Sequence, residues 1–202
     1  LVALGAMAYL AIQPAAAWLL VNQGNNAQAE HDTVSAMKWY RYASMADPGA
    51  TAVRDGLARL CIQRFMETGA PEWLEQAASE MAVAMALNPL DGRPPYRLGT
   101  IYLLQAEQPA WAAHKISLTA QATQAFEKSI SVDPFSPFGY FELSKLYRGK
   151  GDRTSAQQVL EQAITYEPNF IPARMALVDL AREIGHTDAA SMQLTAIQTI
   201  RW

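Results

Sequence analysis

The pattern of apolar and polar positions between residues 137 and 168 predicts a pair of amphipathic helices. Gly149 and Gly151 interrupt the pattern and predict the turn between the helices. Pro168 has no backbone N–H and predicts the end of the second helix. Apolar and small side chains recur at the three- and four-residue intervals that place them on one helix face: Tyr140, Leu143, Ser144, Tyr147, Ala156, Leu160 and Ala163.

The hairpin pattern recurs along the chain. An acidic or amide residue followed by proline marks four hairpin ends, at Pro48, Pro89, Pro134 and Pro168. The last two prolines are 34 residues apart, and the two earlier spacings exceed this length by 11 and 7 residues. Because these numbers are about three and two helical turns, we expect longer hairpins rather than floppy loops. We also expect one helix to stop at Gly69 and others to start at Pro71 and Pro109.

A 34-residue hairpin with small residues at Ala156 and Ala163 resembles the tetratricopeptide repeat. This resemblance implies an all-α chain folded as a right-handed α-solenoid of helix hairpins. The repeat match covers about residues 33–202, and the expected solenoid comprises residues 23–202. The expected units are 23–48, 51–89, 92–134, 137–168 and 171–202.

The first 22 residues form a separate hydrophobic segment. Leu1 to Val21 contains no charged residue, and as a helix it would match the roughly 30 Å thickness of a bilayer core. We expect a transmembrane helix, the alternatives being a signal-peptide core and a buried first helix of the repeats. The first basic residue after it is Lys38, so the repeats are expected outside the cytoplasm, on the periplasmic side of a bacterial inner membrane.

Composition restricts the chemistry of the chain. A net charge of −3 does not suit a nucleic-acid binder. Cys61 is the single cysteine, and His31, His114 and His186 have no metal-binding spacing, so these residues are expected in the core and at exposed turns respectively. The sequence has no phosphate-binding glycine loop. We therefore expect a non-enzyme without a metal or cofactor.

Aromatic and basic residues mark a candidate binding groove. In tetratricopeptide repeats, set positions of each first helix line the concave surface, and the resemblance assigns these positions here to Arg93, Tyr96, Phe138, Phe141, Lys145 and Arg148. Aromatic rings beside cations suit an extended peptide or an acidic polymer. The alternative is that the two phenylalanines pack between repeats and the cations are solvated.

Each of the two insertions carries a tryptophan, Trp73 and Trp111. Successive repeats place their inter-helix ends on the same edge. One hypothesis is that the two rings form an apolar rim that docks on a membrane domain or partner subunit. The alternative is that they pack against each other and stabilise the longer hairpins.

Two segments show a narrower resemblance. Residues 87–107, LNPLDGRPPYRLGTIYLLQAE, and residues 125–147, AFEKSISVDPFSPFGYFELSKLY, are similar to the C-terminal repeats of bacterial O-antigen ligase or polymerase-like membrane proteins. The multi-span catalytic portion of those proteins is absent from this sequence. The resemblance implies a membrane-tethered protein-interaction scaffold associated with surface-polysaccharide assembly. The alternatives are a membrane-anchored accessory or assembly subunit of an unrelated complex and a soluble peptide-binding adaptor.

Overall fold

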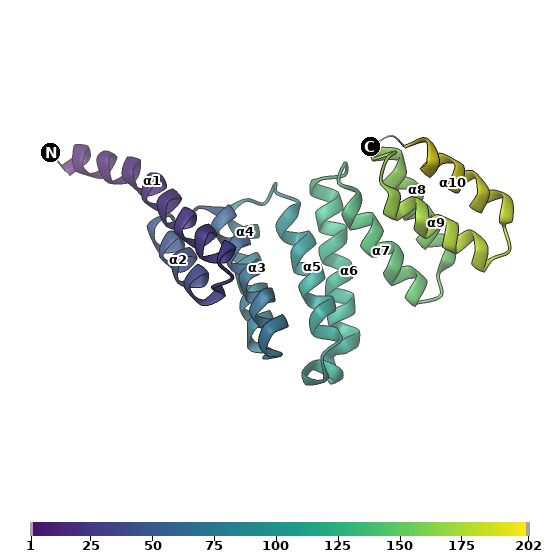
Figure 1. Cartoon of the computed structure of the whole chain (residues 1–202), viewed down its shortest axis with the longest axis horizontal. Coiled ribbons are helices and arrows are strands. Elements are labelled where there is room, and N and C mark those ends of the chain that lie inside the picture. Colours follow the sequence, from purple (N-terminus) through teal and green to yellow (C-terminus); the bar gives the residue numbers. More distant parts are fainter. Residues whose placement is uncertain (1, 201–202) are drawn as a thin grey trace. The chain divides into compact units, whose positions relative to one another are not determined.

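The regular secondary structure of residues 2–200 is entirely helical (Figure 1), as predicted. The computed structural model describes the backbone of residues 2–200 and the side chains of residues 14–200. Its helices are α1 (Val2–Ala29), α2 (Thr33–Ala46), α3 (Thr51–Thr68), α4 (Glu72–Leu87), α5 (Arg93–Ala106), the 3₁₀ helix η1 (Pro109–His114), α6 (Lys115–Val132), α7 (Pro137–Gly149), α8 (Arg153–Tyr166), α9 (Ile171–Glu183) and α10 (Thr187–Thr199).

The helices form two compact units. The first unit comprises Leu1–Pro89 and Thr100–Leu118, and the second comprises Leu90–Gly99 and Thr119–Trp202. The boundary between them therefore crosses α5 and α6. Within the first unit α1 packs on α2 and α3 packs on α4, while within the second unit α7 packs on α8 and α9 on α10.

Tyr40 is the central side chain of the first unit. Its ring is buried between Gly24 of α1 and Gly56 of α3, where a Cβ atom would lie 2.6 Å and 2.1 Å, respectively, from the nearest ring atom. The hydroxyl of Tyr40 donates a hydrogen bond to Asn25 Oδ1 at 2.7 Å. Glycine is thus required at both positions because the ring occupies the space of a side chain.

The seven extra residues of the second predicted hairpin lengthen its helices. α3 and α4 have 18 and 16 residues, compared with 13 and 14 in α7 and α8. The expected helix stop and start are confirmed, because Gly69 ends α3 with a left-handed φ of 70° and Pro71 precedes α4. The expectation of a taller hairpin, rather than a floppy loop, is therefore confirmed here.

The eleven extra residues of the third predicted hairpin are accommodated differently. α6 is long, with 18 residues, but α5 has only 14, and six residues form η1 between them. η1 starts at Pro109, as predicted, and Trp111 has φ −114° and ψ 18°, outside the helical range. The extra residues therefore do not form three further α-helical turns. One cause is Pro109, which has no N–H to continue a helical hydrogen-bond ladder.

Small residues also allow close helix contacts in the second unit. A Cβ on Gly99 of α5 would lie 2.6 Å from the ring of Phe126, which is fully buried on α6. Ser129 Oγ donates a 2.7 Å hydrogen bond to the carbonyl of Gly92, just before α5. Further along, one core cluster joins α7, α8 and α9 through Tyr140, Leu160, Ala163, Ala173, Ala176 and Leu177.

Of the predicted hydrophobic segment, residues 1–22, residues 2–22 belong to α1, and residue 1 lies outside the described residues. Most side chains of this segment lie outside the described residues. Further along α1, Ala17 and Ala27 are buried while Trp18 is 65% exposed, so the C-terminal part of this helix packs on α2 within the first unit. In the part of the chain that the structure describes, no helix has both the length and the apolar character needed to cross a membrane.

Candidate functional site

A row of aromatic rings runs across neighbouring helices of the second unit. The ring centroids of Tyr96 on α5 and Phe138 on α7 are 5.9 Å apart. Phe170, just before α9, packs edge-to-face against both Phe138, at 5.4 Å, and Phe141, at 5.8 Å. Phe138 remains 50% exposed. We call these four residues, Tyr96, Phe138, Phe141 and Phe170, the aromatic strip.

Cations continue from the aromatic strip along α7. The ammonium of Lys145 lies 5.1 Å from the ring centroid of Phe141, a cation–π contact, and 2.5 Å from Glu142 Oε2. Arg148 pairs with Glu183 on α9. Lys145 and Arg148 border a hollow of about 360 Å³, whose other lining residues are Gly149, Gly151, Arg153 and Glu183. Three basic residues and one carboxylate therefore surround this hollow.

Arg93 occupies the first position of α5, one turn before Tyr96. Its guanidinium holds Asp91 through two N–H groups, with Nη2 to Oδ2 at 2.7 Å and Nε to Oδ1 at 2.9 Å. Hydrogen bonds from Arg93 lower the pKa of the Asp91 carboxyl below its usual value. This bidentate pair fixes an exposed cation at the start of the helix that carries Tyr96.

The structure thus places Tyr96, Phe138, Phe141 and Lys145 in one connected set, next to Arg148. It also shows partners that the sequence pattern did not reveal. Phe170 bridges two of the rings although it precedes its helix, where the repeat pattern assigns no contact. The acidic residues that pair with the predicted cations were also missed: Asp91, Glu142 and Glu183. Glu142 lies three residues before Lys145 on one helix, and this spacing could have indicated their pair.

The two tryptophans of the insertions have different surroundings in the first unit. Trp73 is half-buried near the start of α4, and the guanidinium carbon of Arg64 lies 5.7 Å from its ring centroid. Trp111 is half-buried in η1. Among the described side chains, no ring contact joins Trp73 to Trp111. The structure therefore does not show the mutual packing that was the alternative to a docking rim.

The histidines and the cysteine lie where the sequence predicted. His31, His114 and His186 are exposed, and Cys61 is fully buried. Burial raises the pKa of the Cys61 thiol to about 12, with a smaller contribution from the charge of Glu80. The described residues include no group of three His, Cys, Asp or Glu side chains that could hold a metal ion.

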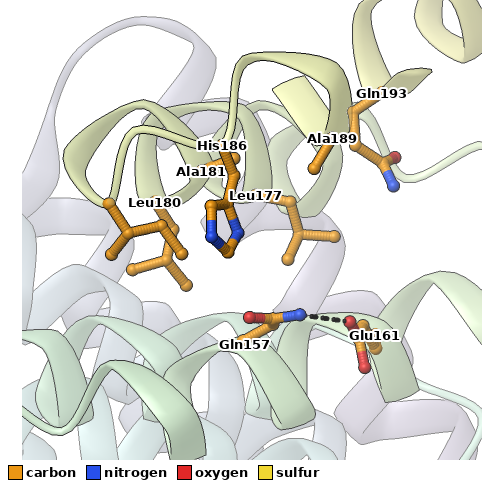
Figure 2. Close-up of a pocket in the computed structure, with 9 residues that line it drawn as sticks. Gln157, Glu161, Leu177, Leu180, Ala181, His186, Ala189 and Gln193 are labelled. Atoms are coloured by element: carbon orange, nitrogen blue, oxygen red, sulfur yellow. Dashed lines mark hydrogen bonds between the residues drawn. The ribbon is translucent and has the colours of Figure 1, made fainter. Parts of the chain in front are cut away.

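A second hollow lies beside His186, between α8 and the last two helices. Figure 2 shows the imidazole directed from the turn before α10 toward Gln157, whose Nε2 donates a 2.8 Å hydrogen bond to Glu161. The hollow measures about 90 Å³. Small-molecule sites commonly measure roughly 300–1,000 Å³, so this hollow is too small for such a ligand.

Comparison with known proteins identifies the architecture. Residues 139–170 match the tetratricopeptide repeat family model. The structure is similar to that of MamA, with 19% identity, 90% coverage of both chains and a TM-score of 0.65. It is also similar to TTC0263, a thermophilic TPR protein in Thermus thermophilus, with 19% identity, 90% coverage of both chains and a TM-score of 0.66.

This chain has the tetratricopeptide-repeat fold. A further similar structure is PilW, a widely conserved type IV pilus biogenesis factor, with 14% identity, 91% coverage of this chain, 76% of that chain and a TM-score of 0.63. No curated protein matches the sequence. Phe141, Lys145 and Arg148 lie within the matched repeat, on its first helix, α7. The matched repeat therefore contains Phe141 of the aromatic strip and the two cations that adjoin it.

Proposed function

We propose that this chain is a non-catalytic interaction scaffold that binds an extended peptide along the aromatic strip and the adjoining cations. The observation that carries the proposal is the half-exposed ring of Phe138, held between Tyr96 and Phe170. A ring fixed on both sides loses little conformational freedom when a ligand covers it. Rigid aromatic side chains of this kind are favourable anchors for a protein partner.

The cations beside the strip favour acidic side chains in that peptide. Lys145 and Arg148 are paired with Glu142 and Glu183 at the surface, where their side chains keep 52% and 30% exposure. Exposed ion pairs stabilise a fold by only about 0–1 kcal/mol. A ligand carboxylate can therefore replace Glu183, which is 39% exposed, at small cost, whereas it would share Lys145 with Glu142, which is only 15% exposed. The same chemistry suits an acidic polymer, which is the second candidate ligand.

A membrane tether is part of the proposal. Residues 1–21 contain no charged side chain, and no Lys or Arg occurs before Lys38, which supports an anchor with the repeats outside the cytoplasm. This topology corresponds to a bacterial inner-membrane protein with a periplasmic scaffold. Carbonate extraction of bacterial membranes tests the anchor. The chain should stay in the membrane pellet, whereas release into the soluble fraction would remove this part of the proposal.

The cellular process that the scaffold serves is proposed from the similarity of two sequence segments. Similarity of residues 87–107 and 125–147 to repeats of O-antigen ligase-like proteins supports a place beside surface-polysaccharide assembly. One protein of the same fold, PilW, is a pilus biogenesis factor, which supports the alternative of an assembly subunit for another complex. Covalent crosslinking in cells separates the two, since glycosyltransferases should be recovered only in the first case.

Peptide selection tests binding at the strip. A phage library of random twelve-residue peptides is selected on the full chain in mild detergent and counter-selected on a strip variant with Lys145→Glu and Arg148→Glu. We expect enriched peptides that combine acidic residues with at least one aromatic or large apolar residue. In anisotropy titrations the strip variant should bind them at least about tenfold more weakly, the loss expected when about 1.4 kcal/mol is removed.

Two further variants control this experiment. A control variant with Lys115→Glu and Lys128→Glu carries the same charge change on exposed positions of α6 and should bind as the wild type does. Phe138→Ala should weaken binding without changing the net charge. Circular dichroism verifies that each variant is folded. Equal affinity of the wild type and the strip variant for every enriched peptide would refute the proposed site.

A further inference from the structure

A separate cleft opens on the first unit, between α2 and α4 at the end of α3. Its volume is about 440 Å³, within the roughly 300–1,000 Å³ that is typical of ligand sites. No residue of the aromatic strip contributes to it. We call it the α2–α4 cleft, and it is lined by Val34, Met37, Lys38, Arg41, Tyr42, Arg64 and Trp73.

The two aromatic rings of the cleft are held in place by their neighbours. Trp73 lies against the guanidinium of Arg64, at 5.7 Å from the ring centroid. Tyr42 packs edge-to-face on Trp39 at 6.0 Å, and the ammonium of Lys38 lies 5.9 Å from the Tyr42 centroid. The rings are therefore positioned before any ligand arrives, which lowers the entropy cost of binding.

The cleft also has an apolar part. Met37, only 5% exposed, is a buried lining residue, whereas Val34 is 63% exposed. Together with the ring of Trp73, these side chains offer a site for one large apolar side chain of a ligand. A half-buried ring that lines a hollow suits such an inserted side chain better than it suits a flat lipid surface.

The charge of the cleft is opposite to that of the chain. The sequence carries a net charge of −3, yet the seven described lining residues include three cations and no carboxylate. Among the described residues, Lys38 and Arg41 form no ion pair, and the guanidinium of Arg41 donates a hydrogen bond to a neutral amide oxygen, Gln76 Oε1, at 3.4 Å. These two exposed cations are thus available to a ligand carboxylate.

Arg64 is the third cation and is oriented by a carboxylate outside the cleft. Its Nη1 donates to Glu67 Oε2 at 2.8 Å, and Glu67 also accepts hydrogen bonds from Thr33 and Gln63. These bonds, the one from Thr33 first, lower the pKa of the Glu67 carboxyl. A guanidinium has five N–H donors, so the pair with Glu67 fixes Arg64 while leaving donors for a ligand.

We propose that the α2–α4 cleft is a second binding site, which takes an acidic peptide segment carrying one aromatic or large apolar side chain. The apolar side chain occupies the space beside Trp73 and Met37, and flanking carboxylates pair with Lys38 and Arg41. Charge complementarity and the apolar side chains of the cleft together select this occupant. The site lies entirely in the first unit and does not depend on binding at the aromatic strip.

The test uses the strip variant as bait, so that binding of acidic peptides at the aromatic strip is weakened. Random twelve-residue peptides are selected on this full chain in mild detergent and counter-selected on a cleft variant that also carries Lys38→Glu and Arg41→Glu. We expect enriched peptides with acidic residues on both sides of one aromatic or large apolar residue. Introducing Lys38→Glu and Arg41→Glu should weaken their binding at least about tenfold.

Control variants show whether a loss of peptide binding comes from the α2–α4 cleft or from a general change in charge or folding. Lys115→Glu with Lys128→Glu, introduced into the same bait, should leave affinity unchanged, and Trp73→Ala should reduce it if circular dichroism shows a folded chain.

Absence of acidic peptides from the enriched set, or affinity unaffected by the cleft substitutions, would overturn the proposal. So would cleft-dependent sedimentation with phosphatidylserine vesicles in the absence of any enriched acidic peptide, which would identify a membrane surface instead. Failure here would leave the proposal for the aromatic strip untouched, since selection and counter-selection differ only at Lys38 and Arg41.

Discussion

Single glycines determine how closely the helices of the first unit approach. Replacing Gly56 by Ala would place a Cβ 2.1 Å from Cε1 of Tyr40, so the buried ring must move. Such overpacking costs about 1–3 kcal/mol, although Ala inside a helix is favoured over Gly by about 1 kcal/mol. We therefore expect Gly56→Ala to lower the free energy of unfolding, measured by urea titration.

A matched glycine provides the control for this prediction. Gly149, the last residue of α7, has a negative φ, and a Cβ added to it would meet no atom within 4 Å. Gly149→Ala should therefore change the free energy of unfolding by no more than about 0.5 kcal/mol. A Gly56→Ala chain as stable as the wild type would show that Tyr40 does not fill the space between α1 and α3.

Cys61 is expected to be chemically inert in the folded chain. Because burial raises its pKa to about 12, the reactive thiolate is scarce at pH 8, where an ordinary thiol of pKa about 8.5 is partly ionised. Alkylation by iodoacetamide should be slow in the native chain and fast in urea. Since the folded pKa exceeds the unfolded one, the thiol also contributes stability that is lost as the pH rises from about 8.5 toward 12. Rapid alkylation of the native chain at pH 8 would contradict the buried position.

At the scale of single elements, aspartate caps begin two of the helices. Asp152 accepts a hydrogen bond from the backbone N–H of Ser155 at the start of α8, and Asp32 does the same from Ser35 at α2. Hydrogen bonds from these serines lower the pKa of both carboxyls. Their stabilisation is therefore present above the ordinary aspartate pKa of about 3.9 and is lost as the pH falls through the lower folded pKa.

Substitutions at Asp152 test the cap. Asp152→Ala should lower the thermal unfolding temperature at pH 7, whereas Asp152→Asn should largely preserve it, because an asparagine oxygen also accepts the Ser155 hydrogen bond. Asp152→Asn should also lose less stability than the wild type between pH 4 and pH 2. Calorimetric melting curves across this range measure both effects. Identical curves for all three chains would argue against a stabilising cap.

Helices and turns that depend on contacts within one helix could be predicted from the sequence, whereas contacts between separate helices could not. Periodic apolar residues and prolines report contacts along one helix, so the turn around Gly149 and the starts at Pro71 and Pro109 could be predicted. The 3₁₀ helix at Trp111 could not, because eleven residues fit whole α-helical turns as well. Phe170 and Glu183 were missed since their contacts join separate helices, and neither position is periodic.

At the scale of the whole molecule, the all-helical repeat fold could be predicted from the sequence. The two proposed binding surfaces could be predicted only in part. The family pattern located three of the four residues of the aromatic strip, all but Phe170, because it assigns surface positions repeat by repeat. It gave no indication of the α2–α4 cleft. That cleft joins Lys38 and Arg41 of one helix to Trp73 of another, and only the packing of the first unit brings them together.

The proposed function depends on binding of an extended peptide along the aromatic strip of the second unit. Hydrogen–deuterium exchange of the full chain, with and without a peptide selected on the strip, tests it most directly. We expect slower exchange in α7 (Pro137–Gly149), at the start of α5 and around Phe170, and unchanged exchange in α2 and α4. Protection confined to other helices, or no protection at saturating peptide, would show that the peptide does not bind along the aromatic strip.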